Sequence, residues 1–232
     1  MKADRAATET PSAEGGSWRE LAVTRSLDPA RVRAENRVQR FLDAALQLMA
    51  SAPDKEFTVQ EVVERSGQSL RSFYLYFAGK HELLLALFEE MVRSSAEQLL
   101  ALTGEVDDPL ERLHVFATEY YRMCRPLVKD KPPKKGVPTP ALAEFAQQLL
   151  TSHPTEASQA FVPIVEVFEQ LLDDAAAAGA IRSGLRNHRI AGIVLQAIMF
   201  NAFATTISGD SRQPSSAGAE ELWQLIFHGI GS

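Results

Sequence analysis

The chain has 232 residues, of which 45% are hydrophobic and 23% are charged, as expected for a globular protein with an ample core. No apolar run reaches the ~18 residues needed to span a bilayer, and the first 20 residues lack the apolar stretch of a signal peptide. The single cysteine excludes an internal disulfide and a cysteine-rich metal site, and the five histidines are scattered in the sequence without a close pair. We therefore expect a cytoplasmic protein without a metal or another cofactor.

The net charge of −6 argues against a nucleic-acid binder, but the charge is unevenly distributed. The first 80 residues carry 12 basic and 11 acidic side chains, whereas the remaining residues carry 12 and 19. A phosphate responds to charges within a Debye length of ~8–10 Å. The acidic excess of the second part therefore does not exclude nucleic-acid binding by the first part.

Residues 1–27 are predicted to form a disordered, basic arm. A helix is expected to begin at Asp28-Pro29, where Asp supplies a cap and Pro a first-turn residue, and to reach Met49. Five arginines, Arg37 among them, lie at the end of the arm and in this helix. Two interpretations stay open: the arm enters a minor groove, or the arginines form a solvated helix end.

Two short helices are predicted next. Thr58 and Glu61 have the spacing of a capping box at the start of the first helix. Ser66-Gly67 is a turn signal that ends it, and Ser69 can cap a second helix of about seven residues. A short helix with a polar face, held on a longer one, is the geometry of a helix-turn-helix, in which the second helix lies in the major groove.

In the second short helix, Phe73 is the expected inward anchor, so that Arg71, Ser72 and Tyr74 point outward. The pattern continues through Tyr76-Phe77, Lys80 and Leu83-Leu84 in fixed register. Together with Thr58, the Ser66-Gly67 turn and Ser69, it resembles the DNA-binding signature of the TetR family of transcriptional regulators. The resemblance covers roughly residues 34–90.

The resemblance implies a set of DNA contacts. Contacts to phosphates are expected from Thr58, Tyr74, Tyr76 and Lys80, and Arg37 is a further expected DNA contact. Base edges should be read by residues in or just before the second short helix, with Arg71 as the strongest candidate for a bidentate contact to guanine. These base-reading candidates are Gln68, Ser69, Arg71 and Ser72.

An all-α fold is predicted: a three-helix DNA-binding domain at residues 28–80, then a helical ligand-binding and dimerisation domain at residues 81–232. Its helices are expected at 80–103, 109–126, 140–152, 155–178, 187–207 and 217–230. Pro163 predicts either a kink or a late helix start. The lysine- and proline-rich segment 129–140 is a loop, interpreted either as a solvated linker or as a gate over a pocket for an anionic ligand.

Residues 187–207 are almost entirely apolar, so a helix there needs cover on every side. The resemblance implies that the last two helices pair with those of a second subunit, and a two-fold dimer would read a near-palindromic operator. The expected interface residues are Ile193, Ala197, Phe200, Leu222, Leu225 and Ile226.

Large, soft side chains recur on several helices of the second domain. Taken singly, each fits a packed core, but together they indicate an apolar cavity for a hydrophobic small-molecule effector. The expected ligand-binding residues are Phe116, Tyr120, Cys124, Phe145, Phe168, Met199 and Phe203. The expected function is a homodimeric repressor released from DNA by that effector, with a helical interaction protein without an effector as the alternative. No enzyme motif is present in the sequence.

Overall fold

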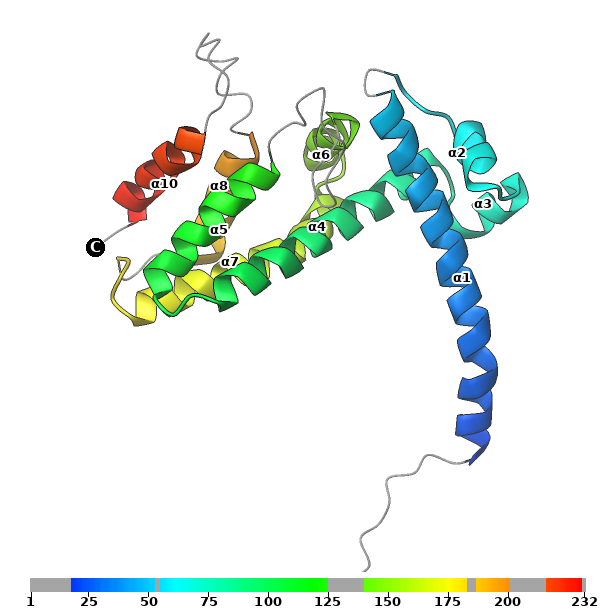
Figure 1. Cartoon of the computed structure of the whole chain (residues 1–232), viewed down its shortest axis with the longest axis horizontal. Coiled ribbons are helices and arrows are strands. Elements are labelled where there is room, and N and C mark those ends of the chain that lie inside the picture. The colour runs from blue at the N-terminus through cyan, green and yellow to red at the C-terminus, as the bar shows by residue number, and fades with distance from the viewer. Residues whose placement is uncertain (1–17, 53–54, 125–139, 183–186, 201–215, 231–232) are drawn as a thin grey trace, which may run out of the picture. The chain divides into compact units, whose positions relative to one another are not determined.

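The structure is a computed structural model, and it describes residues 18–52, 55–124, 140–182, 187–200 and 216–230 (Figure 1). The predicted all-α fold is confirmed, because the elements of the described part are helices. They are α1 (Trp18–Ser51), α2 (Val59–Ser66), α3 (Leu70–Tyr76), α4 (Lys80–Gly104), α5 (Pro109–Met123), α6 (Pro140–Ser152), α7 (Pro154–Ala177), α8 (Asn187–Met199) and α10 (Ser216–Ile230).

The chain divides into two compact units, residues 1–40 and 41–232. The domain limits predicted at residues 28 and 81 stay predictions. Helix α1 begins at Trp18, ten residues before the expected start at Asp28, because the chain stays helical through Pro29. That proline has no N–H to donate within the helix, so the helix tolerates one missing backbone hydrogen bond there.

Aromatic side chains form the core of the short-helix region. The Phe41 ring of α1 lies 5.4 Å from the Phe73 ring of α3 and 6.2 Å from the Phe77 ring, measured between centroids. All three rings are buried, and edge-to-face pairs of this kind contribute ~0.5–1.5 kcal/mol beyond their burial. Phe73 is thus the inward anchor that the sequence predicted.

Helix α4 follows directly and packs along α5 and α7. Its buried residues recur mostly every three or four positions, which gives the helix one apolar face. Helix α7 begins at Pro154 and runs through Pro163, so the late start considered for this helix does not occur. Helices α6 and α8 pack on α7, and α10 packs on α5. Among the described residues, none of the helices combines the length and the hydrophobicity of a membrane span.

Candidate functional site: a nucleic-acid interface and an apolar cavity

A capping box fixes the start of α2. The Thr58 hydroxyl accepts from the Glu61 backbone N–H at 3.2 Å, and the Thr58 N–H donates to the Glu61 carboxylate at 2.7 Å. Lys55 donates to the same carboxylate at 2.9 Å. These hydrogen bonds, that of Lys55 foremost, lower the pKa of Glu61 to about 2. The carboxylate is therefore ionised throughout the neutral range and holds this helix end in place.

The turn between α2 and α3 depends on Gly67. Its φ of 65° is left-handed, and its N–H donates to the Glu64 carbonyl at 3.3 Å. The next N–H, that of Gln68, donates to the Val63 carbonyl at 3.3 Å. Such a left-handed cap satisfies the last carbonyls of α2 and turns the chain sharply. The Ser69 hydroxyl then accepts from the Ser72 N–H at 3.1 Å, which starts α3.

Helix α3 presents a solvent-facing surface beside the buried Phe73. Ser69, Leu70, Arg71, Tyr74 and Leu75 are exposed, and the Tyr74 ring packs edge-on against the Phe73 ring at 5.4 Å. Four of the nine predicted DNA contacts come from these five residues or from the half-buried Gln68. The exposed guanidinium of Arg71 has the geometry to reach a base edge once α3 lies in a groove.

Two of the DNA contacts predicted on α3 are less exposed than expected. Ser72 was expected to point outward, but its hydroxyl oxygen is buried and has no hydrogen-bond partner among the described residues. Tyr76 is half-buried. Ser72 and Tyr76 are four residues apart, so they lie on the same side of α3. That side is next to the buried Phe73, and both side chains therefore turn toward the protein.

Lys80, the first residue of α4, already has partners within the chain. Its ammonium lies 3.0 Å from the exposed carboxylate of Glu56 and 4.8 Å above the Phe57 ring. An exposed ion pair contributes only ~0–1 kcal/mol, so a phosphate can replace Glu56 at small cost. Arg37 is exposed on the part of α1 that belongs to the first unit.

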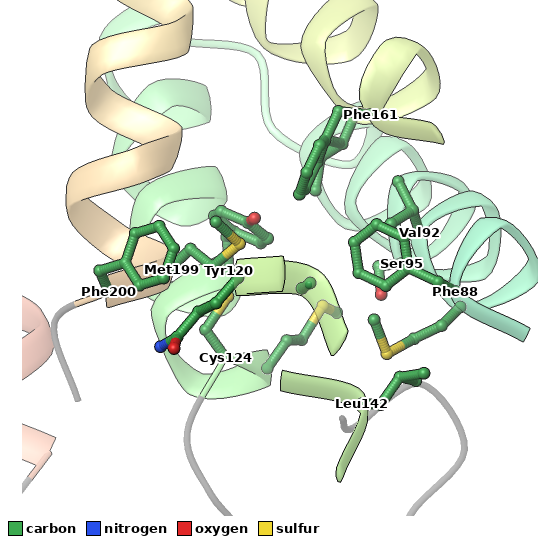
Figure 2. Close-up of a pocket in the computed structure, with 14 residues that line it drawn as sticks. Phe88, Val92, Ser95, Tyr120, Cys124, Leu142, Phe161, Met199 and Phe200 are labelled. Atoms are coloured by element: carbon green, nitrogen blue, oxygen red, sulfur yellow. The ribbon is translucent and has the colours of Figure 1, made fainter. Parts of the chain in front are cut away.

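The second part of the chain contains an apolar cavity with an empty volume of about 620 Å³, part of it open to solvent. Helices α4, α5, α6, α7 and α8 contribute its walls (Figure 2). Aromatic and sulfur-containing side chains dominate the lining, and a few polar groups point into it, including the Ser95 hydroxyl. A cavity with this predominantly apolar lining suits a hydrophobic small molecule.

Tyr120 and Cys124 supply two of these polar groups, and their side chains share a hydrogen bond. Burial raises the pKa of Tyr120, and it raises the pKa of the Cys124 thiol to about 12 although the hydrogen bond with Tyr120 acts the other way. Cys124 as a whole residue is only half-buried, but its sulfur lies on the apolar lining. Both groups therefore remain uncharged at neutral pH.

The predicted ligand-binding residues divide into two groups. Tyr120, Cys124 and Met199 line the cavity, and so do Phe88 and Phe161, which are not among the expected ligand-binding residues. The remaining predicted side chains belong to the surrounding core or fall outside the described residues. Phe116 and Phe168 stack on each other at 4.7 Å, Phe145 packs against Phe88 and His81, and Phe203 lies in the undescribed range.

The residues expected at a subunit interface differ from one another in solvent exposure. Leu225 of α10 is 72% exposed and Ile193 of α8 is 52% exposed, and Ala197 is exposed as well. Leu222 is half-buried, Ile226 is buried within the chain, and Phe200 lines the cavity. Exposed apolar side chains thus remain on α8 and α10, and the subunit interface stays a prediction.

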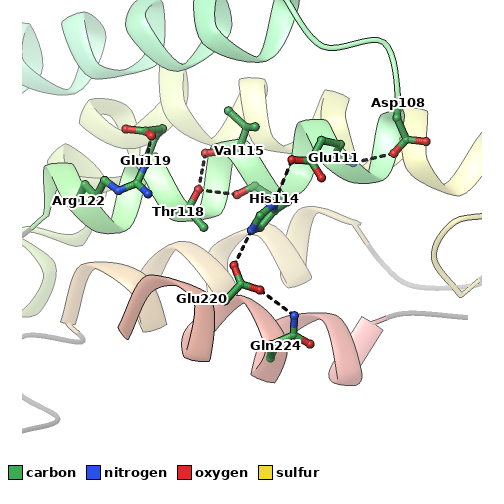
Figure 3. Close-up of polar contacts among 9 residues, drawn as sticks. All are labelled: Asp108, Glu111, His114, Val115, Thr118, Glu119, Arg122, Glu220 and Gln224. Carbon is green, nitrogen blue, oxygen red and sulfur yellow. Dashed lines mark hydrogen bonds and ion pairs between the residues drawn. The ribbon is translucent and has the colours of Figure 1, made fainter. Parts of the chain in front are cut away.

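A polar clamp holds α10 against α5 (Figure 3). The His114 ring bonds through Nε2 to Glu220 at 2.8 Å and through Nδ1 to Glu111 at 3.2 Å. Gln224 donates to the other oxygen of Glu220 at 2.8 Å. Partial burial acts to lower the pKa of His114, but the hydrogen bonds to Glu220 and Glu111 outweigh it and raise that pKa. The clamp therefore favours the protonated imidazole.

The capped α2, the left-handed turn and the exposed face of α3 define a helix-turn-helix protein with a helical second part. Residues 41–87 match the family model described as bacterial regulatory proteins, tetR family. Residues 41–87 thus carry the DNA-binding region that is shared by the TetR family.

The chain is also similar to individual curated proteins and solved structures. The HTH-type transcriptional regulator BetI of Brucella anthropi is 29% identical over 77 residues, so the match spans 33% of this chain and 40% of that relative. The structure of the fatty acid degradation regulator FadR from Bacillus halodurans has a TM-score of 0.62 at 18% identity, over 82% of this chain and 94% of that one. FadR from Bacillus subtilis, solved in complex with stearoyl-CoA, has a TM-score of 0.59 at 15% identity, over 83% and 98%. At these identities the structures share the fold.

Proposed function

We propose that the chain is a sequence-specific, homodimeric transcriptional repressor that leaves a palindromic operator when a hydrophobic small molecule binds. The observation that carries the proposal is the solvent-facing surface of α3 around Arg71 and Tyr74, held by the Gly67 turn and the Phe73 anchor. A rigid helix whose polar side chains face solvent can enter a major groove without rearrangement.

Selection of bound DNA from a random pool tests this proposal. The expected outcome is a near-palindrome whose half-sites lie one helical turn apart, because a two-fold dimer presents two α3 helices. Arg71→Ala should then relax one base position in each half-site, at ~1–3 kcal/mol of discrimination. Arg182→Ala, which removes an exposed arginine outside the helix-turn-helix, serves as the control. Recovery of unrelated sequences would instead favour the alternative of an interaction protein.

The cavity supports an effector with a long apolar portion. Its lining is mostly aromatic, aliphatic or sulfur-containing, and one wall comes from α4, the helix that starts four residues after the last residue of α3. The Bacillus subtilis relative of the same fold was solved with stearoyl-CoA, so fatty acids and their coenzyme A thioesters are the first compounds to examine. A ligand that shifts the start of α4 can change the placement of α3.

The effector is tested by titrating these compounds against the complex with the selected DNA, followed by fluorescence anisotropy. Ser95→Leu fills part of the cavity without changing α3, so it should keep DNA affinity and lose the response. Ser94→Leu is the matched control, because Ser94 neighbours Ser95 on α4 and is absent from the lining. An equal response in Ser95→Leu and the parent would refute the cavity as the effector site.

A further inference from the structure

Two histidines and a glutamate meet where α4 and α7 begin. His81 is the second residue of α4, His153 is the N-cap residue of α7, and Glu156 lies in the first turn of α7. The His81 Nε2 lies 2.7 Å from one carboxylate oxygen of Glu156, and the His153 Nδ1 lies 3.7 Å from the other. The two imidazole rings are 4.6 Å apart between centroids. His81 and His153 are far apart in the sequence, and only the fold brings these two together.

Each of these residues offers a ligand atom, and the three atoms lie within 4.8 Å of one another. In a tetrahedral zinc site with metal–nitrogen bonds of about 2.0–2.1 Å, ligand atoms are about 3.3 Å apart. Small side-chain rotations would therefore bring all three onto one ion. Two imidazoles and a carboxylate form the set that Zn²⁺ and neighbouring divalent transition metals prefer, with a position left for water.

The surroundings admit an ion. All three side chains are about two-fifths exposed, so an ion can enter from solvent. On the inner side, the His81 ring packs against the Phe145 ring of α6 at 5.5 Å. This contact limits the rotation of the imidazole and leaves its Nε2 directed toward Glu156.

We propose that His81, His153 and Glu156 form a binding site for a divalent transition-metal ion of the zinc type. The ion would connect the first turn of α4 to the first turn of α7, two segments that are far apart in the sequence. Binding in the folded state alone stabilises that state by mass action. The site does not depend on the proposed regulatory function, since metal binding is measured without DNA.

Calorimetric titration of ZnSO₄ into the full-length, tag-free, chelator-treated protein tests this site. We expect one ion per chain and a rise in Tm. His81→Asn and Glu156→Gln should each lower the affinity about tenfold or more. His153→Asn should do the same, and because Asn is a good N-cap residue, α7 should keep its start. Titration with Co²⁺ should give visible absorption in the parent that these variants lack.

The control is His188→Asn. His188 also pairs with a carboxylate, that of Glu169, but no third ligand joins them among the described residues. This variant should bind zinc as the parent does. Circular dichroism establishes that each variant is folded. Zinc binding that is unchanged in His81→Asn and His153→Asn, or no binding by the parent, would show that the cluster is an ion pair only.

Discussion

Gly218 of α10 faces the side chain of Tyr121 on α5 so closely that a β-carbon at Gly218 would lie 2.5 Å from the Tyr121 hydroxyl oxygen. Tyr121 is buried, so its ring cannot easily move aside. Gly218→Ala should destabilise the protein by ~1–3 kcal/mol, the usual cost of overpacking, as measured by urea unfolding. Gly229→Ala is the control in the same helix, because no described atom lies within 4 Å of a β-carbon there.

Tyr121→Phe separates this contact from a general effect on α10. It removes the oxygen that the new β-carbon would meet, so Gly218→Ala should cost much less in the Tyr121→Phe background. An equal cost in both backgrounds would mean that the loss arises elsewhere in the helix.

The turn before α3 makes a second prediction. Gly67→Ala forces a β-carbon into a left-handed conformation, which costs roughly 1–2 kcal/mol. Unfolding in urea should show this loss, and operator affinity should fall if the turn relaxes to relieve it. Gly79→Ala is the matched control, because Gly79 has an extended φ of 178° and no described atom near a β-carbon. Similar losses from both changes would contradict the role of the left-handed turn.

The ion pair between Lys80 and Glu56 makes a third prediction, which rests on the proposed DNA interface. Glu56→Gln removes the carboxylate that competes with a phosphate for Lys80, so affinity for specific and unrelated DNA should rise together. Lys80→Ala should weaken both and lower the salt slope by about one per chain. Anisotropy over a salt series measures both effects, with Glu89→Gln on α4 as the control. A change in sequence preference would contradict a phosphate role for Lys80.

The clamp between α5 and α10 predicts a dependence on pH. The pKa of His114 is raised above its ordinary value of 6.5 in the folded chain, so protonation favours folding. The stabilisation is complete below about pH 6.5 and is lost as pH rises through the raised pKa. Thermal unfolding from about pH 6 to about pH 9 should show this decline. Glu220→Gln should flatten it, whereas Glu166→Gln on α7 should not. A Tm of the unmodified protein that rises from about pH 6 to about pH 9 would contradict the stabilising role of protonated His114.

Features set by neighbouring residues were predictable from the sequence. The Thr58–Glu61 capping box, the Gly67 turn and the Ser69 cap all appear as expected, because each involves residues at most five apart. The tolerance of α1 and α7 for an internal proline was not predictable. Each helix gains enough from its remaining hydrogen bonds and packing to continue past a missing donor.

The division between cavity and core could not be read from residue types. Phe116 and Met199 are both large and apolar, but Phe116 stacks on Phe168 whereas Met199 lines the cavity. That difference depends on which helices pack together. The meeting of His81 with His153 has the same origin.

The exposed apolar side chains of Ile193 and Leu225 make the stability and the DNA occupancy of the protein depend on its concentration if a second copy covers them. If a second copy covers them, folding and pairing become one equilibrium, and Tm rises with protein concentration. Operator occupancy would then depend on the square of the number of chains when chains are scarce. For the proposed repressor, modest changes in its synthesis or in its dilution at cell division would therefore change the occupancy of DNA steeply.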